Sequence, residues 1–114
     1  MYQDVMIGDV SVPMVATAST VVWYKQIFKR DLLTLFNSTD ESDFVGEMAY
    51  VMAMQGAKAD MRACNFDTYV AWLDQFTAID LFGERTQNEI IELFIKQQAT
   101  SVAEKKKVDR QNDK

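Results

Sequence analysis

The chain has 114 residues, a length that suits one domain, and its 48% hydrophobic and 25% charged residues match ordinary globular proteins and exclude a disordered chain. It has no run of about 18 apolar residues, so we expect no transmembrane helix and no membrane partner. Its net charge of −5 at pH 7 argues against nucleic acid as the main partner, because phosphate binding needs a basic face.

The first predicted element is a β-hairpin with strands near residues 2–7 and 10–16. Large apolar residues alternate there with polar or small ones, and Gly8-Asp9 suits a two-residue turn because glycine adopts positive φ. Pro13 has no N–H for the ladder, so we expect an edge strand or a Pro13 nitrogen that faces solvent. A two-stranded ribbon is marginal alone and must lie on other elements.

A helix capped by Thr17 or Ser19 follows the hairpin. Its apolar residues recur at intervals of three and four, which is helical spacing. They are Tyr24, Ile27, Phe28, Leu32, Leu35 and Phe36. The sequence also indicates a break near Lys29-Arg30 that divides this helix into two.

A long helix over about 40–63 is predicted to be the central one, introduced by a capping box from Ser38 to Glu41. It is apolar over about two-thirds of its circumference, which is typical of a helix buried among other elements. One narrow stripe is polar and contains Glu47, Gln55, Lys58 and Arg62, together with Val51. Gly56 costs up to about 1 kcal/mol relative to alanine within a helix, and close packing against a neighbour is a reason for it.

Two further helices are predicted. Asn65 caps a helix over about 66–76 with one core-facing stripe, made of Tyr69, Trp72, Leu73 and Phe76. "TAIDLFG" is then expected to be a tight linker that turns at Gly83. A second capping box, Thr86 to Glu89, introduces a helix over about 87–99. We expect it to bury Ile90, Ile91, Phe94 and Ile95, and to leave Leu93 partly exposed.

The predicted fold class is therefore α+β: one mostly helical domain over residues 1–101, with an N-terminal hairpin packed on about four helices. Residues 1–101 hold 14 acidic and 7 basic residues, and residues 102–114 hold 3 and 5. The last segment has only Val102 and Val108 as large apolar residues, so we expect a disordered charged tail.

The residue types that most enzymes use are missing or scattered. The chain has no histidine and one cysteine, Cys64, so a thiol nucleophile lacks its usual base and a His/Cys metal site lacks ligands. We expect Cys64 to be a half-buried packing residue. The four glycines are isolated, which excludes a glycine-rich phosphate loop. We therefore expect no catalysis, cofactor or metal, and a paired-carboxylate hydrolase is the one catalytic alternative that composition leaves open.

The chain begins with twenty residues that carry Asp4 and Asp9 but no Lys or Arg, which is unlike a secretory signal. A single cysteine cannot form an internal disulfide. Both features indicate the cytoplasm.

Seven methionines suggest another role, because the flexible thioether serves both core filling and promiscuous binding. Four lie on the predicted central helix and either fill core gaps or line a groove for a partner's apolar segments; they are Met48, Met52, Met54 and Met61. With Val102 and Val108 they are the candidate partner-binding residues.

Several stretches resemble, in order over about residues 4–96, the tail assembly chaperones of long-tailed bacteriophages and prophages of Gram-positive hosts. They begin with "IGDVSVPMVATASTVVWYKQIFKRDLL" and continue with "GEMAYVMAMQ", "YVAWLDQF" and "NEIIELF". The sharpest pieces are "YKQIF" with "DLL", "EMAYVMAMQ" and "WLDQF". Most are core patterns, and their order and spacing carry the resemblance.

The resemblance implies a non-enzymatic protein of the bacterial host cytoplasm that is absent from the mature virion. Such chaperones bind the apolar, helical tape measure protein, keep it soluble and help to recruit tail tube subunits. A programmed ribosomal frameshift typically adds an extension that contacts the tube protein. Lys105, Lys106 and Lys107 have A-rich codons where such a slip is possible, and a solvated basic run is the alternative.

Three other interpretations stay open. The first is a small structural connector or adaptor of a phage, which the virion would retain. The second is a nucleic-acid binder that uses the basic tail, with affinity that falls steeply with salt. The third is the paired-carboxylate enzyme named above. Self-association is a separate open point, because an edge of the hairpin can pair between chains.

Overall fold

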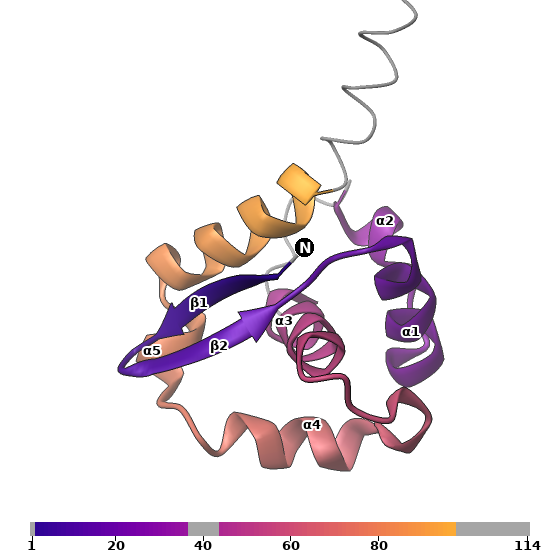
Figure 1. Cartoon of the computed structure of the whole chain (residues 1–114), viewed down its shortest axis with the longest axis horizontal. Helices are drawn as coiled ribbons and strands as arrows, with labels where there is room; N and C mark the ends of the chain where they lie inside the picture. The colour runs from indigo at the N-terminus through magenta and orange to yellow at the C-terminus, as the bar shows by residue number, and fades with distance from the viewer. Residues whose placement is uncertain (1, 37–43, 98–114) are drawn as a thin grey trace, which may run out of the picture.

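The computed structural model describes residues 2–36 and 44–97, and it confirms a mostly helical α+β domain with an N-terminal hairpin (Figure 1). The elements are β1 (Gln3–Ile7), β2 (Val10–Met14), α1 (Ala18–Phe28), α2 (Leu32–Phe36), α3 (Phe44–Gly56), the 3₁₀ turn η1 (Met61–Ala63), α4 (Phe66–Leu73) and α5 (Ala78–Phe82). Residues 84–97 form a further helix, called here the C-terminal helix. The predicted tail, 102–114, lies outside the described residues. No helix in the described ranges is long and apolar enough to cross a membrane.

The hairpin forms as predicted. Gly8 takes a φ of 62° at the turn, and the register pairs Ile7 with Val10 and Asp4 with Pro13. A two-residue turn makes its flanking pair hydrogen-bonded, so by alternation Asp4 and Pro13 form a non-hydrogen-bonded pair. The Pro13 nitrogen therefore points away from β1 and costs no ladder bond, which confirms the expected edge position.

The hairpin packs on the centre of the domain through one face only. Its inward side chains are buried, namely Val5, Ile7, Val12 and Met14. The backbone N–H of Val15 donates to the Met52 carbonyl in α3, at an N–O distance of 3.2 Å. The end of β2 is therefore attached to the central helix as well as to β1.

The predicted break after α1 is also present. Lys29 adopts the left-handed conformation, with φ 63°, and its N–H donates to the Lys25 carbonyl at 2.8 Å. Asp31 then begins α2, since its carboxylate accepts the N–H of Leu33 at 3.1 Å. The chain thus reverses within three residues and places α2 beside α1.

Helix α3 lies in the middle of the domain, with the hairpin and the other helices around it (Figure 1). It ends at Gly56, so the prediction of one helix to residue 63 is wrong. The N–H of Ala59 donates to the Met54 carbonyl at 2.9 Å, and the N–H of Lys58 donates to the Gln55 carbonyl at 3.0 Å. With Lys58 at a φ of 57°, these two bonds make a Schellman motif, which closes the helix. The predicted capping box over residues 38–41 lies outside the described residues.

Helix α4 begins at the predicted cap, Asn65, whose side chain accepts the N–H of Thr68 at 3.0 Å. It ends at Leu73, three residues before the predicted end. Tyr69 and Trp72 are buried, and Leu73 and Phe76 are half-buried against the core.

The predicted linker over residues 77–83 is wrong, because it contains helix α5. Thr77 caps this helix by accepting the N–H of Asp80 at 3.1 Å. Gly83 has an ordinary φ of −68°, so it does not supply a left-handed turn. A methyl group at Gly83 would lie 2.5 Å from the Ile79 carbonyl oxygen, and this close approach explains the glycine.

The C-terminal helix begins at residue 84, before the predicted capping box, and Thr86 is buried within it. The predicted exposure of two residues is reversed: Leu93 is buried and Ile95 is 47% exposed. Ile95 lies about 140° around the helix from the buried Ile90, on the solvent side. The side chain of Gln97 accepts the backbone N–H of Ala16 at 2.8 Å, which ties this helix to the end of the hairpin.

Candidate functional site

The structure places the predicted methionines mainly in the core. Met48 and Met52 are fully buried and Met61 is nearly so, while Met54 is half-buried against the same core. These side chains therefore fill space between α3 and its neighbours and do not form an exposed groove. Val102, Val108 and the lysines at 105–107 lie outside the described residues.

A polar cluster joins α1 to α3 at the buried side of the central helix. The Glu47 carboxylate accepts a hydrogen bond from the Tyr24 hydroxyl and another from the Arg30 guanidinium, each at 2.5 Å. Arg30 also donates to the Tyr24 oxygen at 3.2 Å. The Glu47 side chain is only 15% exposed and that of Arg30 is 34% exposed. The ion pair is therefore partly shielded from water.

The environment of this cluster alters two pKa values. Burial, and then the hydrogen bond to Glu47, raises the pKa of Tyr24 far above its ordinary value. The hydrogen bond to Glu47 is also the main cause of a raised pKa for Arg30. Tyr24 thus stays protonated as a donor and Arg30 stays charged at neutral pH. The cluster holds α1 against α3 by charge-assisted hydrogen bonds.

A second set of polar contacts lies two turns further along α3. The Thr20 hydroxyl donates to the Gln55 side-chain carbonyl at 2.6 Å, and the Gln55 amide donates to the Ser19 hydroxyl at 2.9 Å. Between the two sets, Val51 is fully buried. The stripe predicted on the central helix therefore faces α1 over Glu47, Val51 and Gln55.

A cluster of aromatic rings also connects α1, α3 and α4. Phe28 lies 5.1 Å from the Tyr69 ring and 6.4 Å from the Tyr50 ring, measured between centroids. Tyr50 in turn lies 5.6 Å from Trp72. Burial raises the pKa of Tyr50 to about 12, and its hydroxyl lies 2.6 Å from the Thr68 hydroxyl. Cys64 is half-buried near this cluster, as predicted.

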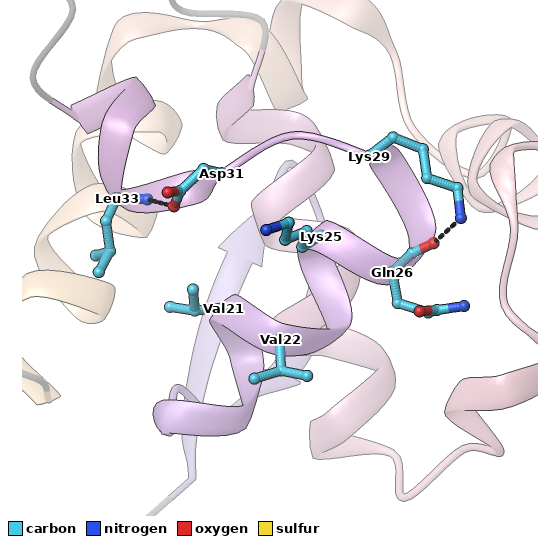
Figure 2. A pocket seen from close by; sticks show the side chains of 7 residues that line it. All are labelled: Val21, Val22, Lys25, Gln26, Lys29, Asp31 and Leu33. Carbon is cyan, nitrogen blue, oxygen red and sulfur yellow. Dashed lines mark hydrogen bonds between the residues drawn. The ribbon is translucent and has the colours of Figure 1, made fainter.

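One hollow of the surface is a groove between α1 and α2, called here the α1–α2 groove (Figure 2). It has a volume of about 690 Å³ and is lined by Val21, Val22, Lys25, Gln26, Lys29, Asp31 and Leu33. Val22 and Leu33 are 64% and 55% exposed. The sequence places Val22, Lys25 and Lys29 at helical spacing, but only the reversal after Lys29 brings Leu33 beside them.

A second hollow of about 470 Å³ lies between the hairpin turn and α5. Met6 and Ile79 contribute apolar surface there, and Asp80, Glu84 and Arg85 contribute charge. Two of these three charged residues are acidic, so the lining of this hollow has the same sign of charge as the chain as a whole.

Within residues 2–36 and 44–97, no group of three or more His, Cys, Asp or Glu side chains is placed to hold a metal ion. Comparison with protein-family models, curated proteins and solved structures found no match for this chain.

Proposed function

We propose that the chain is a non-enzymatic tail assembly chaperone of a long-tailed phage or prophage of a Gram-positive host. It binds the tape measure protein, keeps it soluble and helps to recruit tail tube subunits. The observation that carries the proposal is the resemblance of "YKQIF", "EMAYVMAMQ" and "WLDQF", in that order, to this group of proteins.

The packing of these pieces supports the proposal. Tyr24 in the first piece bonds Glu47, the first residue of the second piece, and Gln55, its last residue, bonds Thr20. The Trp72 ring of the third piece contacts Tyr50 of the second. The stretches that carry the resemblance are therefore those that fasten α1 and α4 to the central helix.

The surface supports a role in binding apolar helices. Exposed large apolar side chains occur on α1, α2, α4, α5 and the C-terminal helix, and they include Val22, Leu33, Phe66, Val70, Ile79 and Ile95. The chain around them is acidic. Net charge of one sign opposes aggregation, while apolar helix faces accept a partner helix in a groove.

The proposal is tested in the phage or prophage that carries the gene. We expect deletion to prevent tail formation, with tape measure protein lost or insoluble, and complementation in trans to restore tails. We also expect mass spectrometry of purified particles to lack the protein. A connector or adaptor would instead be retained in the particles, and that result would contradict the chaperone proposal.

The frameshifted extension is a separate part of the proposal. Expression of the native gene with its flanking DNA and an N-terminal tag should give a minor, longer product whose peptides change frame near Lys105 to Lys107. A single product would reject the proposed frameshift. The chain itself would then have to recruit the tube protein, without an extension.

A further inference from the structure

We propose that the α1–α2 groove binds an amphipathic helix whose apolar residues are flanked by aspartate or glutamate. This inference rests on the proposed function, since it assigns the site and the kind of tape measure segment that the site accepts.

The apolar part of the groove is formed from two elements. Val22 on α1 and Leu33 on α2 are largely exposed, and Val21 lies half-buried between the helices (Figure 2). Covering such side chains removes apolar surface from water, which favours binding. A partner helix offers apolar side chains at intervals of three and four, which suits a groove bordered by two helices.

The charges of the groove select the partner. Among the described residues, the Lys25 ammonium makes no hydrogen bond or ion pair, and the Lys29 ammonium donates only to the Gln26 carbonyl of its own helix, at 2.8 Å. Asp31 is the one acidic residue of the lining, and its carboxylate already accepts the Leu33 N–H.

The neighbouring Arg30 does not add to this site, because its guanidinium is bound to Glu47. Two lysine ammonium groups thus face solvent beside exposed apolar side chains, on a chain with a net charge of −5. An acidic segment is attracted to this groove and repelled by the body as a whole, which fixes where it docks.

The experiment uses the full chain and three synthetic helical peptides. All three carry the same leucines at positions i, i+3, i+4 and i+7, and the flanking positions are all glutamate, all glutamine or all lysine. We expect the glutamate peptide to bind about tenfold more tightly than the lysine peptide, with an affinity that falls as salt rises. Amide NMR shifts should concentrate over residues 21–33.

Two groove variants and two matched controls locate the site. Val22→Glu and Lys25→Glu should each weaken binding of the glutamate peptide about tenfold, and Lys25→Glu should also remove the preference over the lysine peptide. Val10→Glu and Lys58→Glu place the same changes on exposed residues elsewhere, and we expect affinities within about twofold of the original chain. Circular dichroism confirms that each variant is folded.

Equal binding of the glutamate and lysine peptides, no binding, or shifts centred on the exposed Phe66 and Val70 of α4 would each overturn the groove assignment. Those results leave the chaperone proposal to its own test with tape measure protein. Conversely, the glutamate peptide could bind the groove while the chain fails to keep tape measure protein soluble. That result would support the groove as a binding site and reject the proposed function.

Discussion

Gly56 at the end of α3 lies directly against the backbone of Pro13 in β2, so that a methyl group on Gly56 would come within 2.9 Å of the Pro13 carbonyl carbon. The atoms that the methyl group would meet belong to the backbone of β2 and cannot move aside as a side chain can. The nearby hydrogen bond from the Val15 N–H to the Met52 carbonyl holds β2 and α3 in place. The hairpin therefore reaches the central helix only because this position has no side chain.

We predict that Gly56→Ala lowers the free energy of unfolding by about 1–3 kcal/mol, although alanine is the better helix former by about 1 kcal/mol. Urea unfolding followed by tryptophan fluorescence measures the change. Gly46→Ala is the matched control in the same helix. Its methyl group would meet the ends of two side chains and not backbone, the edge of the Phe82 ring at 2.8 Å and the Tyr69 hydroxyl at 3.0 Å, and side chains can shift. An equal or greater loss at Gly46 would contradict the account.

Glu47→Gln tests the polar cluster between α1 and α3. The amide can still accept a hydrogen bond from Tyr24, but Arg30 loses its charged partner. We expect a loss of about 1–3 kcal/mol in the free energy of unfolding, towards the low end because Arg30 is one-third exposed. Glu92→Gln, on an exposed residue of the C-terminal helix, should change it by less than about 0.5 kcal/mol. Equal effects of the two variants would mean that the polar cluster contributes nothing to the stability of the fold.

Stability should fall at alkaline pH. Burial raises the pKa of Tyr50 to about 12, against about 10 in the unfolded chain, and it raises the pKa of Tyr24 as well. The folded state therefore holds these protons more tightly. The contribution of each tyrosine is complete below about pH 10, and that of Tyr50 is lost as the pH rises towards about 12.

Urea midpoints measured across this alkaline range, with tyrosinate absorption as a second readout, test the prediction. Tyr50→Phe should reduce the dependence of stability on pH, because the proton of the Tyr50 hydroxyl no longer contributes. A stability that is constant through this range would show that both hydroxyls ionise in the folded state as they do in water.

The methionines of α3 should behave as core residues. Met52→Ala removes a fully buried side chain, so we expect a loss of about 2–5 kcal/mol in the free energy of unfolding. Met54→Ala, at a half-buried position of the same helix, should cost clearly less. If Met52→Ala left stability unchanged and weakened partner binding, the assignment of this side chain to the core would be wrong.

Local chemistry explains which elements could be predicted from sequence. The Gly8 turn, the Asn65 cap and the break after α1 depend on a few adjacent residues, and all three are present. The end of α3 could not be predicted, because the apolar pattern continues beyond Gly56 and the left-handed residue that closes the helix is a lysine. Helix α5 has five residues, too few to show a helical period.

The contacts between elements were harder to predict from the sequence. Glu47 and Gln55 stand out as a polar stripe, but the same stripe fits either water or a polar partner helix. Only the packing of α1 shows that Tyr24 and Thr20 meet it. The α1–α2 groove likewise depends on the reversal at Lys29, which determines where Leu33 lies relative to Val22.

The most direct test of the central claim is co-expression of this chain with the tape measure protein that we propose as its partner. We predict that the tape measure protein is insoluble alone, becomes soluble with the chain and is purified in complex with it. A tape measure protein that is equally soluble with and without the chain, and that does not bind it, would contradict the account.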